Sequence, residues 1–105
     1  MQGHNHGWMT EEYMEAIQSS WNNIEKIMSA LGDEYTYIIT SDHGGHDRTH
    51  GSDMPEDMII PVIINGRDFE KGQIYGDVNI MDIAPTVAKL LNVEPDEDWE
   101  GCSLI

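Results

Sequence analysis

The sequence has little of several residue types, and each shortage excludes a class of protein. It contains one cysteine, Cys102, in 105 residues, so no internal disulfide can form. Five Lys and Arg residues stand against 20 Asp and Glu residues, which gives a formal net charge of -15. A surface with that charge repels phosphate backbones, so we expect no nucleic-acid partner.

Long apolar runs are also missing. The longest, around residues 59–64, is far shorter than the roughly 20 residues that a membrane-spanning helix needs. The first eight residues, MQGHNHGW, have no basic stretch followed by an apolar core and so do not resemble a secretory signal. A single cysteine is compatible with a reducing compartment. We therefore expect a cytoplasmic protein with no membrane partner.

The spacing of apolar residues predicts two helices. Over 10–31 the apolar side chains recur at steps of three and four, which marks one stripe of an amphipathic helix that Thr10 can cap. A second helix is expected over 82–92, with Asp82 as its N-cap and Asn92 as a left-handed stop. The stripe of the first helix consists of Met9, Tyr13, Ile17, Trp21, Ile24, Met28 and Leu31.

Two or three strands are expected between these helices. EYTYIIT, at 34–40, and MIIPVIING, at 58–66, are rich in β-branched residues, and 73–79 can add a short third strand. Pro61 favours an edge position or a bulge for the second strand. Nearly continuous apolar strands are typical of sheets covered on both faces. The sequence therefore predicts an α/β fold in which two main helices pack on two to three strands, as part of a larger protein.

The stretch TSDHGGHDRTHG, at 40–51, follows the first expected strand and concentrates groups that can bind a metal ion. Asp42 and His43 offer one carboxylate oxygen and one imidazole nitrogen, a pair that suits zinc or manganese. His50 can return to the same place after the glycine-rich turn, and His4 and His6 can join it if the first helix starts near the strand ends. His6 can equally well face solvent. An Asp-His pair in a loop is also common in solvated turns, so both interpretations stay open from these residues alone.

Four segments in this order resemble the C-terminal third of the alkaline phosphatase superfamily, and specifically its type I phosphodiesterase/nucleotide pyrophosphatase and sulfatase-like enzymes. The segments are GHNHGWMTEEYMEAI, TSDHGGH with the later HG, PEDMIIPVIINGRDFEKG and VNIMDIAPTVAKLLNVEPDEDWEGCSL. The resemblance covers essentially the whole chain. It implies a partial alkaline-phosphatase-like sandwich and a single C-terminal fragment, residues 1–105, of a larger domain.

The resemblance also implies a site with two divalent metal ions, most simply zinc or manganese, about 4 Å apart. Asp42 and His43 would bind the ion that activates the nucleophile, and His50 and His4 would bind the other. His46 is expected to support one of these ligands or to act as a further one. The aspartate that the family places four residues before the histidine at position 4 has no counterpart in the sequence. The residues that do not match the family's nucleophile are Thr10, Thr40, Ser41 and Cys102.

The expected function is therefore that of a fragment of a metal-dependent hydrolase of small-molecule phosphate mono- or diesters, inactive by itself because the nucleophile is missing. One alternative is a sulfatase-type hydrolase of sulfuric esters with a calcium ion. Metal preference separates the two, since calcium takes oxygen ligands whereas zinc and manganese accept imidazoles. The alternative of another class is a non-catalytic acidic α/β module that binds a partner, or forms a homodimer, through an uncovered sheet face.

Overall fold

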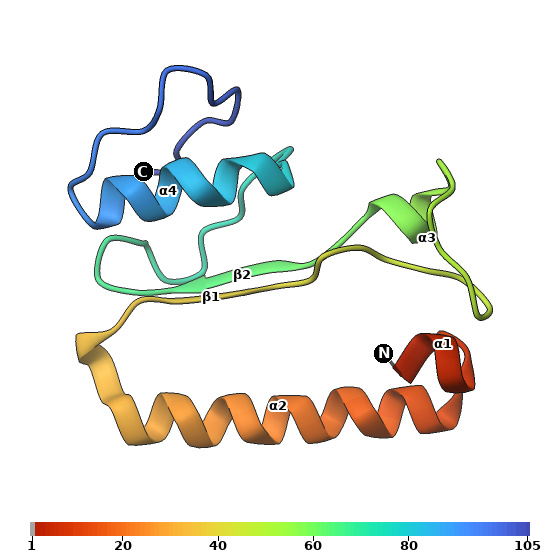
Figure 1. Cartoon of the computed structure of the whole chain (residues 1–105). Coiled ribbons are helices and arrows are strands. Elements are labelled where there is room, and N and C mark those ends of the chain that lie inside the picture. The colour runs from red at the N-terminus through yellow and green to blue at the C-terminus, as the bar shows by residue number, and fades with distance from the viewer. Residues whose placement is uncertain (1) are drawn as a thin grey trace. The chain divides into compact units, whose positions relative to one another are not determined.

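The computed structural model describes residues 2–105, which fall into two compact units, the first ending at Ile64 and the second covering Asn65–Ile105. The strands pair as one two-stranded sheet and run in opposite directions (Figure 1). These elements confirm the expected α/β class, with two main helices, α2 and α4. In chain order the elements are α1 (Gln2–His6), α2 (Glu11–Leu31), the 3-10 turn η1 (Gly32–Glu34), β1 (Tyr37–Thr40), α3 (Pro55–Met58), β2 (Val62–Asn65), the 3-10 turn η2 (Ile80–Asp82) and α4 (Ile83–Leu90).

The long helix α2 begins and ends where its sequence signals predict. Thr10 has extended backbone angles, and its side-chain oxygen accepts a hydrogen bond from the Tyr13 N–H, as an N-cap does. Gly32 ends the helix with a φ of 68°, and its N–H donates to the Met28 carbonyl. The Tyr37 hydroxyl donates to the Gly32 carbonyl at 2.7 Å, which ties the start of β1 to the end of α2. Among the described residues no helix, α2 included, combines the length and apolarity needed to cross a membrane.

The apolar faces of this chain are largely uncovered. No side chain of α2 is buried, and Trp21 and Leu31 of its predicted stripe are 40% and 44% exposed. Ala88 is the single hydrophobic residue that is buried among residues 2–105. The 11.9 kDa chain has an accessible surface of 8190 Å². Two separate compact globules with the sizes of the two units would together expose less, roughly 7,100 Å². Homodimerisation through an uncovered face stays a prediction.

The strands are shorter and fewer than the sequence predicts. β1 begins at Tyr37 because the 3-10 turn η1 occupies the three residues that end at Glu34. β2 begins at Val62, since α3 extends to Met58 and Pro61 has no N–H to donate to a strand partner. The predicted strand at 73–79 is wrong, because this segment is irregular and pairs with no strand of residues 2–105.

In the second unit, a carboxylate and a hydroxyl tie the C-terminal tail to α4. Asp82 stands at the predicted N-cap of α4, but its side chain makes no capping bond to that helix. It accepts hydrogen bonds from the Asn79 N–H and the Cys102 N–H, each at 2.8 Å. The fully buried Thr86 hydroxyl donates to the Asp82 carbonyl at 2.6 Å and accepts from the Leu104 N–H at 3.0 Å. This unit is therefore held by polar contacts around the start of its helix.

Candidate metal centre

Three histidine rings from two distant segments lie together in the first unit. The rings of His43 and His50, both in the loop after β1, stack with centroids 3.7 Å apart and planes 18° apart. His4, on α1, lies edge-on to His50 with ring centroids 4.9 Å apart. Figure 1 shows α1 beside the loop that joins β1 to α3. The structure thus gathers three of the four side chains that the sequence proposes as ligands.

The fourth predicted ligand, Asp42, lies next to His43. Its Oδ2 atom is 3.5 Å from the Nε2 atom of His43, and its side chain is 86% exposed. Its Oδ1 atom accepts a hydrogen bond from the His43 N–H at 3.0 Å. A hydrogen bond from its own backbone N–H is the main cause that lowers the pKa of the Asp42 carboxyl. Asp42 is therefore ionised near neutral pH and open to an incoming cation.

Backbone carbonyls orient two of the histidine rings. The Nδ1 atom of His43 lies 2.7 Å from the Gly44 carbonyl oxygen, and the Nδ1 atom of His4 lies 3.2 Å from the Arg48 carbonyl oxygen. Because a carbonyl oxygen can only accept, each Nδ1 must carry the hydrogen. The neutral ring then keeps its lone pair on Nε2. Metal-binding histidines are commonly held in this way, with the second nitrogen donating to a carbonyl or a carboxylate.

Trp8, which the sequence analysis does not place at the site, packs among the histidines. Its ring centroid is 5.2 Å from that of His4 and 6.3 Å from that of His50. A Cβ atom at Gly3 or at Gly45 would collide with the Trp8 ring, so both positions need glycine for this close approach. Neither glycine has a positive φ, so the close approach of the Trp8 ring, and not the backbone conformation, is what requires glycine at both positions.

A tight turn attaches α1 to the loop between β1 and α3, residues 41–54, called the histidine loop below. His46 and Thr49 exchange backbone hydrogen bonds of 3.1 and 2.9 Å, and Asp47 between them has a φ of 48°, which Asp tolerates better than most residues. The Asp47 carbonyl accepts from the Trp8 N–H at 2.7 Å. Together with the bond between the His4 ring and the neighbouring carbonyl, this contact fixes α1 against the loop.

A buried carboxylate, Asp57, underlies the loop and has no counterpart among the predicted site residues. Its side chain is 1% exposed and accepts from His46 Nδ1 at 2.7 Å. It also accepts from the Ser52 N–H at 2.8 Å and the Ser52 hydroxyl at 2.6 Å. These bonds, those from Ser52 first, lower the pKa of the Asp57 carboxyl from 3.8 to about 2. The hydrogen bond to Asp57 in turn raises the pKa of His46.

The available donor atoms suit a divalent metal ion, although the side chains are not arranged as a finished site. Within residues 2–105 no three His, Cys, Asp or Glu side chains form a ready-made metal cluster. The chemistry of the set nevertheless fits zinc or manganese, which bind neutral imidazole and carboxylate together. The assignment of Asp42, His43, His50 and His4 as ligands, and of His46 as a supporting group, stays a prediction.

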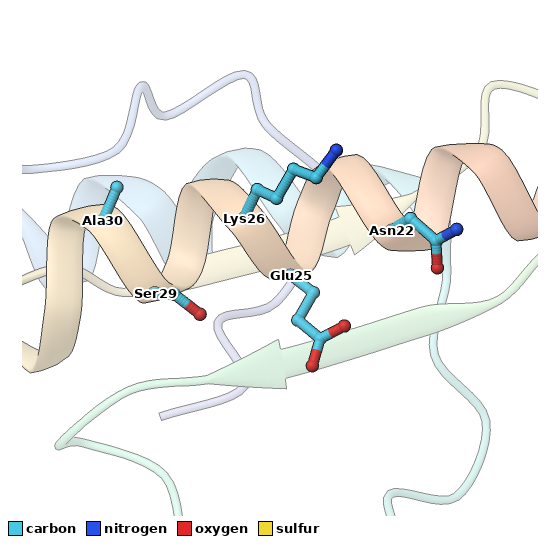
Figure 2. A pocket seen from close by; sticks show the side chains of 5 residues that line it. All are labelled: Asn22, Glu25, Lys26, Ser29 and Ala30. Atoms are coloured by element: carbon cyan, nitrogen blue, oxygen red, sulfur yellow. The ribbon is translucent and has the colours of Figure 1, made fainter.

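A surface hollow of about 670 Å³ lies elsewhere, along α2. Figure 2 shows the five side chains that line it, all of them from this one helix. None is a histidine, and none is a predicted ligand, so the chemistry of the chain points to the histidine loop instead. The lining residues are Asn22, Glu25, Lys26, Ser29 and Ala30.

Comparison with known proteins places this chemistry in a family. The sequence profile of the Metalloenzyme superfamily matches residues 1–95. Phosphopentomutase of Alkaliphilus metalliredigens (strain QYMF) is 34% identical over 90 residues, which cover 85% of this chain and 23% of that protein. The 2,3-bisphosphoglycerate-independent phosphoglycerate mutase of Antithamnion sp. is 32% identical over 99 residues, 88% of this chain and 19% of that protein. The same enzyme of Staphylococcus aureus (strain N315) is 33% identical over 95% of this chain and 20% of its own length. No solved structure matches the chain.

These relatives refine the resemblance seen in the motifs. They are named as mutases, so the finer expectation of a phosphodiesterase, nucleotide pyrophosphatase or sulfatase branch is not supported, while the broader likeness to alkaline phosphatase is confirmed. The chain spans about a fifth of the length of these relatives. The family description itself names metal-dependent enzymes. With its profile match over residues 1–95, the chain belongs to the Metalloenzyme superfamily, the alkaline-phosphatase-like group to which its motifs point.

Proposed function

We propose that this chain provides part of the metal centre of a phosphoryl-transfer enzyme that acts on a phosphorylated small molecule. The observation that carries the proposal is the meeting of His4, His43 and His50, with Asp42 beside His43. Phosphoryl chemistry is supported by the relatives, whose names describe a phosphopentomutase and a phosphoglycerate mutase. Because the chain spans about a fifth of those proteins, the reaction is proposed for an enzyme of their length, in which residues 1–105 form one C-terminal fragment.

In this proposal the four side chains divide into two pairs. Asp42 and His43 hold one divalent ion, and His4 and His50 hold a second, each histidine through its Nε2 atom where Nδ1 is already engaged. Two such ions neutralise the charge that develops on a phosphoryl group during in-line transfer. Imidazole ligands favour zinc or manganese over calcium.

The nucleophile of the reaction is proposed to lie outside these 105 residues. Thr10 caps α2, and its hydroxyl donates to the Gly7 carbonyl at 2.8 Å. The Ser41 hydroxyl donates to the His43 carbonyl at 2.7 Å, so it too has a local role. Cys102 is exposed and belongs to the other unit. The chain's own contribution is thus to bind and orient metal ions.

The relatives favour transfer over hydrolysis as the reaction class. Hydrolysis of phosphate mono- or diesters is what the motifs imply, and hydrolysis of sulfuric esters is the alternative. A phosphomutase moves a phosphoryl group to another position of its substrate and does not transfer it to water. The mutase names of the relatives therefore direct the proposal to phosphate esters that are rearranged.

Calorimetric titration of the chain with Mn²⁺ and Zn²⁺ tests this proposal. We expect the affinity to fall at least tenfold in His43→Ala and in His50→Ala, because each removes an imidazole ligand. His6→Ala is the matched control, since His6 is an exposed histidine on the same short helix as His4 and is expected to face solvent. Equal losses in all three variants, or no binding by the unaltered chain, would contradict the proposal.

A further inference from the structure

We propose that Asp57 is a positioning residue, whose buried carboxylate and backbone carbonyl together hold His50 against His43. The consequence for metal affinity rests on the proposed function, whereas the arrangement of the rings does not. Asp57 lies on the four-residue helix α3, outside every motif that the metal chemistry uses. It is one of two buried polar or charged residues among residues 2–105.

The Asp57 carboxylate holds the C-terminal part of the histidine loop through hydrogen bonds. Its Oδ2 atom accepts both the N–H and the hydroxyl of Ser52, at 2.8 and 2.6 Å. Ser52 follows His50 by two residues, so the backbone of His50 lies within about 7 Å of the residue that binds the Asp57 carboxylate. The Oδ1 atom of Asp57 accepts a hydrogen bond from the ring of His46, the residue that begins the tight turn in the middle of the loop.

The backbone of the same residue holds the near end of the loop. The Gly44 N–H donates to the Asp57 carbonyl at 2.9 Å, and the Gly45 N–H donates to the Glu56 carbonyl at 2.7 Å. Gly44 directly follows His43 in the sequence. A Cβ atom at Gly44 would collide with the Glu56 carbonyl, so glycine is what permits this approach. One residue therefore anchors the chain next to both stacked histidines.

A buried carboxylate is a strong anchor only while its donors remain. An ionised carboxylate accepts hydrogen bonds and donates none, and its bonds are stronger than those between neutral groups. An asparagine has nearly the same size, but its amide nitrogen cannot accept. In Asp57→Asn the amide would face the Ser52 or the His46 donors without a matching acceptor, so the loop is expected to open.

Nuclear Overhauser contacts between the ring protons of His43 and His50 test this inference on the metal-free chain. We expect these contacts in the unaltered chain and their loss in Asp57→Asn. Ser52→Ala, which removes one of the two bonds from that residue, is a milder variant and should weaken them. Glu56→Gln, at the exposed neighbouring acid, is the matched control and should keep them. Dispersed amide signals from α2 show in each case that the variant folds.

The outcomes separate this inference from the proposed function. Rings that stay in contact in Asp57→Asn and Ser52→Ala, or that lie apart in the unaltered chain, overturn the inference whether or not metal binds. If the rings separate, Mn²⁺ affinity measured by calorimetry should also fall about 10- to 100-fold, as it does when the supports of metal ligands are removed. Ring contacts that depend on Asp57 in a chain without Mn²⁺ or Zn²⁺ affinity would support the inference and contradict the proposed function.

Discussion

Asp57 in the first unit and Asp82 in the second both hold another segment of the chain through hydrogen bonds to a carboxylate, but the segments that they hold differ. Asp57 lies within the four-residue helix α3, and Asp82 is the last residue of the 3-10 turn η2. Each carboxylate accepts a backbone hydrogen bond from outside that turn: Asp57 from Ser52, five residues before it, and Asp82 from Cys102, 20 residues after it. Both carboxyl groups have a lowered pKa, Asp57 chiefly through Ser52 and Asp82 chiefly through the Asn79 N–H.

The difference lies in what each carboxylate holds. The segment tied to Asp57 carries His43, His46 and His50, and one of these rings is itself a partner of the carboxylate. The segment tied to Asp82 is the C-terminal tail, which carries no histidine. The same local interaction therefore builds a candidate chemical site in one unit and a structural closure in the other. What the tied segment carries decides the function.

The largest effects are expected from Gly44→Ala and Gly101→Ala. In both, the new Cβ would collide with a backbone carbonyl, that of Glu56 or of Met81, and neither position has a positive φ. Overpacking of this kind costs about 1–3 kcal/mol of unfolding free energy, measurable by urea denaturation. Gly44→Ala should also separate the His43 and His50 rings, whereas Gly101→Ala should not.

Gly76→Ala is the control for this pair, because an added Cβ there would meet nothing within 4 Å. If Gly44→Ala leaves the ring contacts and the stability unchanged, the close approach between the loop and α3 does not exist in solution. If Gly101→Ala changes the contacts between the His43 and His50 rings, the close approaches at Gly44 and at Gly101 are not independent.

An intermediate effect is expected from pH. The lowered pKa of Asp57 means that its contribution to stability is present above the unfolded value of 3.8 and is lost as the pH falls toward about 2. Asp82 behaves in the same sense, since its pKa is lowered as well. The raised pKa of His46 adds stability that is full below 6.5 and is lost as the pH rises through the raised value. The contact between Asp57 and His46 contributes to both pKa shifts and is counted once, whereas the hydrogen bonds from Ser52 contribute to the shift of Asp57 alone.

Amide chemical shifts followed by NMR against pH distinguish the contact of Ser52 with Asp57 from the contact of Cys102 with Asp82. The Ser52 amide should respond both in acid and on the alkaline side of 6.5, because Asp57 and His46 are coupled. The Cys102 amide should respond in acid alone, since its carboxylate partner, Asp82, has no histidine among its hydrogen-bond donors in residues 2–105. If the chemical shift of the Cys102 amide changed near neutral pH as much as that of Ser52, the contacts of Asp57 and Asp82 would not differ in the way proposed.

The smallest effect on the site is expected from Asp82→Asn. The amide should weaken the bonds from the Asn79 and Cys102 N–H groups and loosen the tail, which hydrogen exchange of the Cys102 amide would register. The His43 and His50 ring contacts and the Mn²⁺ affinity should stay within twofold of the unaltered chain. A larger change at the histidines would mean that the second unit also positions the metal centre.

The sequence predicts best what depends on local periodicity and caps. The bounds of α2 follow from Thr10 and Gly32, and the left-handed stop predicted at Asn92 is present with a φ of 54°. The gathering of His43 and His50 follows from a strand end and a glycine-rich turn between them. In these cases the deciding interaction lies within a few residues of the signal.

The rest depends on side-chain and strand contacts that no local pattern of residues reports. Asp57 looks like one more acid in SDMPEDM, and nothing in its spacing shows that it accepts from Ser52 and His46. Trp8 reads as an ordinary apolar residue until Gly3 and Gly45 are seen on its ring. The mistaken strand at 73–79 has suitable residues but lacks a partner strand, which propensity cannot report.

The most direct test of the central claim is the broadening of histidine ring signals by substoichiometric Mn²⁺, followed by NMR on the 105-residue chain. Paramagnetic broadening falls steeply with distance, so it identifies the rings nearest the ion. The account predicts that the signals of His4, His43 and His50 broaden first, followed by His46, with exposed His6 affected least. Equal broadening of all five histidines, or earliest broadening at His6, would contradict it.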